Sequence, residues 1–342
     1  MKILVTGSSG YYSQILCNFL SANGYLCYGI DLLEGELSNL MGYTKLDLLD
    51  KNSLRKIFEK NQFSAVIHLA SQIDFAVKKQ SDLYFNNLQS TKNILTLSKE
   101  FGIKKIIFTS SNSIYLGNDK EIIGELDIPV PIDEYGRSKI DCENILNECK
   151  AELDINIIRC PNIIDSGRVG MLSILFELLQ SNSTLWMLKG GEVRHQTIYA
   201  EDLNKAILKL LQYSGSTVHN IGCDEVKNFK EIFTYLIELS KSNSKLRCVP
   251  DFIVIPLLKL AYRFNLSPLG PYQFRMLTRD FCFDTNKIKG DLNWFPEKNN
   301  AETLGIAYDF YLKNENIIKN KKNANSGAVN LGILKILKIL KF

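Results

Sequence analysis

A tyrosine and a lysine in this sequence have a spacing that suits proton transfer. Tyr135 and Lys139 are four residues apart, so they would share one face of a helix. The run Ile140–Lys150 spaces its apolar residues as an amphipathic helix does. A phenol titrates near pH ~10, and a neighbouring cation lowers its pKa. The pair could exchange a proton with a hydroxyl or carbonyl group; the alternative is a surface helix with an unrelated Tyr and Lys.

A glycine turn near the start of the chain suits a phosphate group. Lys2–Thr6 predicts a buried strand, and a helical pattern through Leu20 follows the turn that contains Gly7 and Gly10. In a strand, turn and helix of this kind, the glycines permit a tight turn and the helix N-terminus faces a pyrophosphate. Ser13 stands where a third glycine is usual, so it could crowd the helix against the strand.

An acidic residue follows the second predicted strand. Tyr25–Ile30 reads as a strand, and Asp31 comes directly after it, about 20 residues after the glycine turn. A carboxylate at that place can bond ribose hydroxyls and would repel a 2′-phosphate, which favours NAD over NADP. A helix cap or a turn aspartate is the alternative for Asp31.

Small and polar residues follow the other predicted strands as well. Strands alternate with helices, which implies a parallel sheet whose ligands gather at the carboxyl ends of its strands. By this interpretation Gly7, Asp31, Ala70 and Ser111 all lie at that edge, which strengthens the catalytic interpretation of the Tyr–Lys pair. His68 reads as a packed strand histidine. The further strands are expected at Ala65–Leu69, Lys105–Thr109 and Ile155–Arg159.

Composition excludes several classes of protein. The chain has 342 residues, 45% of them apolar and 23% charged, which is ordinary for a soluble globular protein. None of its eight cysteines forms a C-x-x-C pair, so neither zinc nor a redox dithiol is expected. We expect a cytoplasmic protein with reduced thiols, because no signal peptide and no membrane-spanning run are evident.

The positive charge belongs to the C-terminal end. Residues 313–342 contain seven lysines and one acid, which leaves 34 basic and 36 acidic side chains in residues 1–312. The body is therefore not expected to bind nucleic acid.

In the rest of the chain, extended segments are expected at Val193–Tyr199 and Thr217–Ile221, and a turn at Pro268–Pro271. Helices are expected at Leu83–Phe101, Met171–Leu179, Ala200–Leu211, Phe229–Ser240 and Phe252–Phe264.

The last residues suggest a membrane contact. Residues 314–330 read as a flexible linker, and 331–342, called the tail below, read as a short helix with lysines on one side and aliphatic residues on the other. Such a helix is too short to span a bilayer but suits its interface, so we expect peripheral binding to the inner leaflet. The alternative is a helix docked on the body or on a second subunit, as in a homodimer.

These features together resemble the extended short-chain dehydrogenase/reductase family, in the branch of nucleotide-sugar epimerases and dehydratases. The likeness covers roughly residues 1–313. The motifs that carry it are Thr6-Gly7-Ser8-Ser9-Gly10, His68-Leu69-Ala70, Asn87 with Thr91-Lys92-Asn93, Ser110-Ser111, Tyr135-x-x-x-Lys139, Arg159-Cys160-Pro161-Asn162 and Leu292-Asn293-Trp294-Phe295-Pro296. The resemblance implies an α/β fold with a Rossmann-type doubly wound parallel sheet, mainly in residues 1–160. A smaller mixed α/β substrate lobe, mainly 161–313, would follow, with some return to the sheet and then the C-terminal amphipathic helix.

The resemblance also implies roles for individual residues. Tyr135 would be the general acid/base, Lys139 would bond the nicotinamide ribose and depress the pKa of Tyr135, and Ser111 would orient the reacting oxygen. The residues assigned to NAD are Gly7, Ser9, Gly10, Tyr11, Tyr12, Asp31, Asp47, Leu48, Leu69, Ala70, Ser71, Asn87, Tyr135, Lys139, Pro161 and Asn162. Those assigned to the substrate are Asn162, Arg194, Arg275 and Arg279, since arginines can grip a phosphate bidentately. No metal is implied.

Departures from the family pattern narrow the chemistry. The 4,6-dehydratases carry an Asp-Glu pair after the active-site hydroxyl, and decarboxylating members need a Glu there, but this chain has Asn112-Ser113. Epimerisation, oxidation or reduction remains, most simply on a phosphate-bearing sugar such as a nucleotide sugar or a glycan precursor. Ile164–Gly167 replaces the usual Tyr-Gly-Pro, which departs from conventional sugar-nucleotide contacts. The apolar Phe252–Phe264 segment favours a lipid-like sterol or isoprenoid alcohol instead, and a non-catalytic NAD-binding protein is the third alternative.

Overall fold

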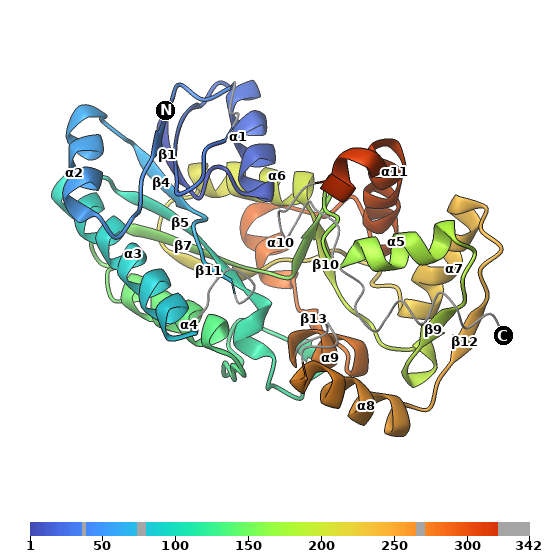
Figure 1. Ribbon diagram of the computed structural model, residues 1–342. Coiled ribbons are helices and arrows are strands. Elements are labelled where there is room, and N and C mark those ends of the chain that lie inside the picture. The colour runs from blue at the N-terminus through green and yellow to red at the C-terminus, as the bar shows by residue number, and fades with distance from the viewer. Residues whose placement is uncertain (36–38, 74–79, 265–270, 321–342) are drawn as a thin grey trace.

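A parallel sheet of seven strands forms the first lobe of the molecule (Figure 1). The computed structural model describes residues 1–35, 39–73, 80–264 and 271–320. The order of the strands is β11-β7-β5-β4-β1-β2-β3, so the chain reverses its direction of growth between β1 and β4. Such a switch point leaves a crevice at the carboxyl ends of the strands. The strands are β1 (Lys2–Thr6), β2 (Leu26–Asp31), β3 (Gly42–Lys45), β4 (Ala65–His68), β5 (Lys105–Ser111), β7 (Asp154–Cys160) and β11 (Thr217–Asn220).

Helices cover both faces of this sheet, as the alternation of side chains on β1 requires. Ile3 and Val5 point into one core cluster and Leu4 into the other, and all three are fully buried. The first cluster is closed by α1 (Tyr11–Ala22), α6 (Ala200–Gln212) and α10 (Asn286–Leu292). The second is closed by α2 (Lys51–Lys60), α3 (Gln80–Glu100) and α4 (Glu134–Asn147).

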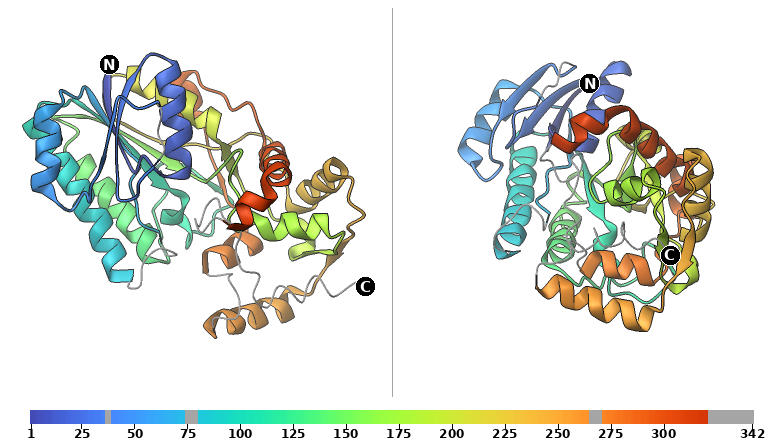
Figure 2. Two further views of the ribbon diagram at one scale, coloured as in Figure 1. Left: turned by 45° about the horizontal axis from the view of Figure 1, so that its top comes forward. Right: turned by 45° about the vertical axis from the view of Figure 1, so that its right-hand side comes forward.

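The second lobe lies beside the carboxyl ends of the sheet and has a core of its own (Figures 1 and 2). That core is built on α5 (Leu172–Gln180), α7 (Phe229–Ser240) and α11 (Asn300–Asn320). Three short parallel pairs complete the lobe: β8 (Asn162–Ile164) with β10 (Thr197–Tyr199), β9 (Leu185–Met187) with β12 (Leu246–Cys248), and β6 (Ile122–Ile123) with β13 (Cys282–Phe283). The helices α8 (Asp251–Arg263) and α9 (Pro271–Thr278) form its outer edge.

The predicted doubly wound sheet is confirmed, while several short elements differ from the expectation. Val193–Tyr199 was expected to be extended throughout, but the strand is only Thr197–Tyr199, and Arg194 and His195 make isolated bridges. The helix α11 continues to Asn320, seven residues into the expected linker. The remaining linker, the tail and most of the predicted Pro268–Pro271 turn lie outside the described residues. In the part of the chain that the structure describes, no helix is long and apolar enough to cross a membrane.

Candidate active site

Helix α4 carries the Tyr–Lys pair and is held close to the end of β5. The carboxylate of Asp133 caps the helix by accepting the Gly136 N–H at 2.7 Å. A Cβ at Gly136 would lie 2.6 Å from the Ser113 carbonyl oxygen, so only glycine allows α4 to approach the 3₁₀ turn Asn112–Tyr115 this closely. The first turn of α4 is therefore fixed against the segment that follows Ser111.

The ammonium group of Lys139 is buried in the space between α4 and β5. Its Nζ donates to the Thr109 carbonyl at 2.8 Å and lies 4.7 Å from the centre of the Phe108 ring. It is also 5.7 Å from the centre of the Tyr135 ring, as the i, i+4 spacing predicts. Burial lowers the pKa of Lys139 to about 8, because the charged form loses hydration that one carbonyl and one ring replace only in part.

The pKa of Tyr135 moves in the direction opposite to the one expected from its lysine neighbour. Burial raises it above the usual value for a phenol, while hydrogen bonds to Ser111 and Ser71 act in the lowering direction. Loss of hydration thus outweighs the two hydrogen bonds that favour the phenolate. The structure brings Ser71, Ser111 and Tyr135 together around one phenol oxygen, and the neutral phenol is the form present at neutral pH.

Ser111 ends β5 and organises the turn that follows it. Its hydroxyl accepts the Ser113 N–H at 3.1 Å and lies 3.1 Å from the Ser113 hydroxyl. Asn112 and Ser113 are both buried, and neither carries the acid that dehydration or decarboxylation would need. The site therefore presents a phenol and hydroxyls but no carboxylate at that position.

Tyr272 is a site residue that the sequence reasoning did not identify. It comes from α9, and its hydroxyl donates to the Asn162 amide oxygen at 3.2 Å and lies 3.4 Å from the Asn112 amide nitrogen. Burial raises its pKa. Tyr272 ties the second lobe to the ends of β5 and β7, close enough to Tyr135 for the two phenols to interact. No local sequence signal marks it, because its partners are 110 and 160 residues away.

The glycine turn has the geometry of a cradle for a diphosphate. Gly7 has a φ of +70°, and a Cβ there would lie 2.7 Å from the Ala70 Cα. Gly10 precedes α1, and no side chain caps that helix, so its first N–H groups remain available to an anion. Ser13 is buried and accommodated without a third glycine.

The carboxylate of Asp31 lies beside this turn, as predicted. One of its oxygens accepts the Ser9 N–H at 2.9 Å and the other accepts the Leu33 N–H at 3.0 Å. These bonds fix the carboxylate at the end of β2, where it suits ribose hydroxyls and disfavours a 2′-phosphate. The uncapped helix, the glycine cradle and this acid together fit NAD.

Other residues assigned to the cofactor hold the surrounding loops. Asn87 accepts the Gln72 N–H at 2.7 Å and donates to the Ser138 hydroxyl at 3.1 Å, which ties the loop after β4 to α4. Asp47 accepts the Leu49 N–H at 2.9 Å. The Leu48 carbonyl accepts an N–H from Asn93 at 2.8 Å. The rest lie on α1, on the loop after β4 or directly after β7: Tyr11, Tyr12, Leu69, Ala70, Ser71 and Pro161.

The three arginines assigned to the substrate are already engaged with protein groups. Arg194 makes a two-nitrogen ion pair with Asp280, at 2.9 Å from Nε and 2.7 Å from Nη2. Arg275 donates to the carbonyls of Leu116 and Asn118 at 2.9 and 2.7 Å, and Arg279 pairs with Asp119. All three serve to join the segment around α9 to its neighbours, which sequence spacing alone could not show.

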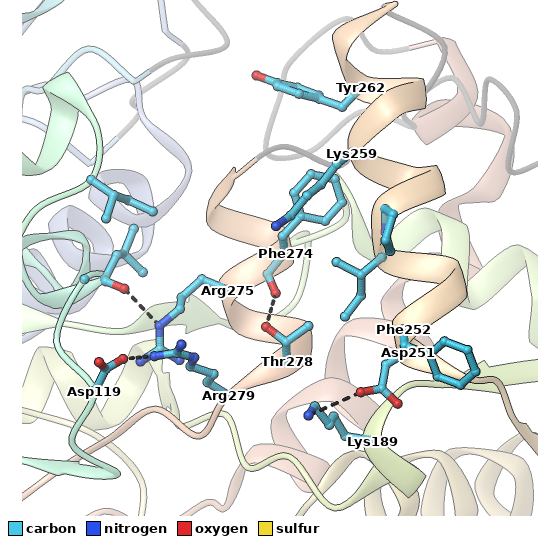
Figure 3. A pocket seen from close by; sticks show the side chains of 15 residues that line it. Asp119, Lys189, Asp251, Phe252, Lys259, Tyr262, Phe274, Arg275, Thr278 and Arg279 are labelled. Atoms are coloured by element: carbon cyan, nitrogen blue, oxygen red, sulfur yellow. Dashed lines mark hydrogen bonds and ion pairs between the residues drawn. The ribbon is translucent and has the colours of Figure 1, made fainter.

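Arg275 and Arg279 also line a cavity of about 890 Å³ between α8 and α9 (Figure 3). Its wall is mainly apolar, with Phe252 and Ile255 from α8 and Phe274 from α9. Neither Tyr135 nor Arg194 lines it. In the described residues, no cluster of three or more His, Cys, Asp or Glu side chains is arranged to hold a metal ion.

Comparison with known proteins identifies relatives of this chain. Residues 3–222 match the family described as the NAD dependent epimerase/dehydratase family. An uncharacterized protein of Sinorhizobium fredii, y4nG, is 29% identical over 315 residues, which cover 91% of this chain and 78% of the relative. A UDP-glucuronate 4-epimerase of Thermodesulfobacterium geofontis is 26% identical over 239 residues, 64% of this chain and 74% of the relative.

A solved structure shows that the same fold occurs in a characterised protein. The UDP-glucose 4-epimerase of Thermotoga maritima, determined with UDP-glucose, superposes with a TM-score of 0.76 at 23% identity. The match covers 92% of this chain and all of the other. The similarity therefore spans both lobes.

Proposed function

This chain belongs to the NAD-dependent epimerase/dehydratase family, and from that premise we propose that it is an epimerase of a nucleotide-linked sugar, with Tyr135, Lys139 and Ser111 as its catalytic residues. The main observation behind the proposal is that the side chains of Tyr135, Ser111 and Ser71 lie together at the carboxyl ends of the strands. The glycine cradle and Asp31 lie beside them. A UDP-linked sugar is the substrate class that the named epimerase relatives suggest.

Each residue of the site would have a separate role in the reaction. NAD, when bound, supplies a hydride acceptor and donor. Gly7 and the N-terminus of α1 would hold its diphosphate, and Asp31 its adenine ribose. Tyr135 would exchange the proton of the reacting sugar hydroxyl. Ser111 would hold that oxygen in place. The buried ammonium of Lys139 would stabilise the phenolate whenever Tyr135 gives up its proton.

The residues after Ser111 support hydride chemistry over elimination. An elimination of water needs an acid and a base that act on neighbouring carbons. Asn112 and Ser113 supply neither, and Asn112 is engaged with Tyr272. An epimerase needs only one proton carrier and a cofactor that takes and returns the hydride, and the site holds that set.

The direct test is a reaction of the full-length protein with NAD and UDP-glucose, UDP-N-acetylglucosamine or UDP-glucuronate, followed by NMR of the sugar protons. We expect one of these substrates to form its 4-epimer without accumulation of NADH. Net formation of NADH in proportion to product would show a dehydrogenase instead. Loss of water from the sugar would contradict the reading of Asn112 and Ser113.

A second candidate substrate is a lipid-like alcohol or a lipid-linked sugar. The apolar cavity between α8 and α9 favours it, because four of the side chains in its wall are Phe252, Ile255, Pro256 and Phe274. Oxidation of a detergent-solubilised isoprenoid alcohol, with NADH formed in equal amount, would support this candidate over the nucleotide sugar.

We keep the prediction that the tail contacts the inner leaflet of a membrane. It rests on the alternation of lysine and aliphatic residues from 331 to 342, which lie outside the described residues. Deletion of residues 328–342 should release the protein from anionic vesicles in a cosedimentation assay. Release of a subunit from a homodimer, without any vesicle binding by the full-length chain, would favour the alternative.

A further inference from the structure

The cavity between α8 and α9 has a wall made mostly of hydrocarbon groups. Its volume of about 890 Å³ is typical of a small-molecule site. The uncharged residues that line it are Leu116, Gly117, Ile132, Phe252, Ile255, Pro256, Tyr262, Phe274 and Thr278. Of these, only Tyr262 and Thr278 have a polar side-chain group, and the Thr278 hydroxyl already donates to the Phe274 carbonyl at 2.7 Å (Figure 3). The wall therefore suits a hydrocarbon chain better than a group that needs many hydrogen bonds, such as a nucleotide base.

The same cavity has a net positive charge. Four basic and two acidic side chains line it, which gives a net charge of +2: Lys189, Lys259, Arg275, Arg279, Asp119 and Asp251. Asp251 pairs with Lys189 at 3.2 Å, and Asp119 pairs with Arg279. The excess charge therefore belongs to the remaining two cations, Lys259 and Arg275.

These two cations lack an acidic partner within the described part of the chain. Arg275 donates to the carbonyls of Leu116 and Asn118, and its Nη1 is buried with no hydrogen-bond partner among the described residues. Lys259 is exposed on α8, and Figure 3 shows its side chain pointing from α8 toward α9. An anionic group in the cavity would give the Arg275 Nη1 a partner and balance both charges.

The active site lies on another side of α9. The Tyr272 hydroxyl donates to Asn162 there, whereas Phe274 and Arg275 line the cavity. Tyr135 does not line the cavity. A molecule in the cavity could therefore be held without contact with the catalytic phenol.

We propose that this cavity is a binding site for an anionic amphiphile. Its hydrocarbon chain would lie against Phe252, Ile255 and Phe274, and its phosphate or carboxylate headgroup would be held by Lys259 and Arg275. The proposal does not depend on the reaction proposed above, and it does not make the bound molecule a substrate.

Charge argues against an occupant from this chain itself. The tail contains three lysines and no acidic side chain, so it has the same sign as the cavity. A second copy of α8 would bring two bases and one acid, which is again a net positive charge. An anionic small molecule complements the cavity, whereas these two segments do not.

The test titrates decyl phosphate, below the concentration at which it forms micelles, into the full-length protein in a calorimeter. We expect one molecule to bind per chain. 1-Decanol and inorganic phosphate should each bind at least about tenfold more weakly, because one lacks the charge and the other lacks the chain. Decanoate distinguishes a fatty acid from a lipid phosphate as the source of the headgroup, and binding of either anion supports the proposal. Equal binding of 1-decanol and of the anionic probes would overturn it.

A pair of variants on α8 tests the role of the cation. Lys259→Gln should weaken the binding of decyl phosphate about tenfold, since a charge-assisted hydrogen bond is lost. Arg263→Gln is the matched control, because Arg263 is exposed on the same helix but does not line the cavity. Thermal unfolding checks that both variants fold. An equal loss of affinity in both variants would show a general attraction to a basic helix and would overturn the proposal.

A local probe and two competitors identify the place of binding. Phe252→Trp should shift its fluorescence to shorter wavelength when decyl phosphate is added, whereas Phe295→Trp, away from the cavity, should not. Displacement of decyl phosphate by UDP would assign the cavity to the nucleotide of a substrate. Tighter binding after deletion of residues 328–342 would make the tail the natural occupant. Either result would overturn the proposal.

Discussion

At the scale of single residues, burial decides the charge states of the site. The Lys139 Nζ lies 5.7 Å from the centre of the Tyr135 ring, yet burial raises the pKa of Tyr135 and lowers that of Lys139 to about 8. Both directions favour the uncharged group, because each loses water that its neighbours replace only in part. The i, i+4 spacing correctly predicts that the two side chains are neighbours. The direction of each pKa change depends instead on how deeply the group is buried.

The phenol oxygen of Tyr135 should be essential to the reaction. Tyr135→Phe should lower kcat by about 10²–10⁴-fold, since it removes a proton carrier, and should leave NAD affinity nearly unchanged. Tyr84→Phe is the control, because the Tyr84 hydroxyl donates to Asp141 at 2.5 Å, where it joins α3 to α4 and has no assigned role in the reaction. Initial rates and isothermal titration with NAD measure both quantities. A Tyr135→Phe enzyme with most of its activity would remove this residue from the mechanism.

His68 should make the fold sensitive to acid. Its ring is buried between the Thr6 and Thr91 hydroxyls, at 2.7 and 3.1 Å, and burial lowers its pKa to about 3. The unfolded chain binds a proton there below pH ~6.5 and the folded chain does not, so the stabilising effect of neutral His68 is lost as the pH falls from 6.5. Between pH 7 and 5 this should cost about 2 kcal/mol of unfolding free energy.

Urea unfolding at several pH values measures this effect. His68→Gln should flatten the decrease in unfolding free energy between pH 7 and 5 relative to the unchanged protein. Parallel pH curves for the two proteins would show that His68 takes up its proton in the folded state.

At the scale of elements, the turn from β1 into α1 depends on Gly7. Gly7→Ala should destabilise the protein by several kcal/mol and weaken NAD binding, because the added Cβ would meet Ala70 backbone atoms at 2.7 and 2.8 Å. Gly24→Ala is the matched control: its φ is +81°, but no atom lies within 4 Å of the added Cβ. It should cost only about 1 kcal/mol of conformational strain. Similar losses for both variants, by thermal unfolding, would show that close packing at Gly7 is not decisive.

The long elements of both lobes could be predicted from sequence, whereas the short strand pairs and the tertiary contacts of the second lobe could not. The glycine turn and the pattern around Tyr135 are local signals, and β1 and α7 have the predicted bounds. The pairs β6–β13 and β9–β12 are two or three residues long, so no periodicity develops in them. The role of Tyr272 and the pairing of Arg194 with Asp280 depend on tertiary contacts over 86 to 160 residues.

At the scale of the whole molecule, the first lobe contains segments from the second half of the chain as well as from the first. Helix α6 and the segment through Trp294 belong to the core that β1 and α1 begin, and the Trp294 indole donates to the Asp202 carbonyl at 2.8 Å. The strand β11 pairs with β7 and closes that edge of the sheet. The first lobe therefore includes segments from both sides of the boundary expected near residue 160, which agrees with the expected partial return of the later residues to the sheet.

A fragment of residues 1–160 should fail to fold. It lacks the α6 and α10 side chains that cover one face of the sheet, and it leaves β7 as a bare edge. A chain of residues 1–320 keeps all of these and should unfold cooperatively like the full-length protein. Denaturation followed by circular dichroism distinguishes the two. A cooperative transition in the short fragment would mean that the later segments are dispensable for this core.

The return of β11, α6 and Trp294 to the first lobe has a consequence during synthesis. The ribosome releases β7 about 130 residues before it releases the end of this core, which at ~5–20 residues per second is a delay of about ten seconds. Until β11 is released, about 60 residues after β7, the nascent chain presents an unpaired strand edge, and until α6 and α10 are released one face of the sheet lacks part of its cover. The risk of aggregation is therefore greatest while the chain is still being synthesised. A chaperone that shields β7 would act during that interval.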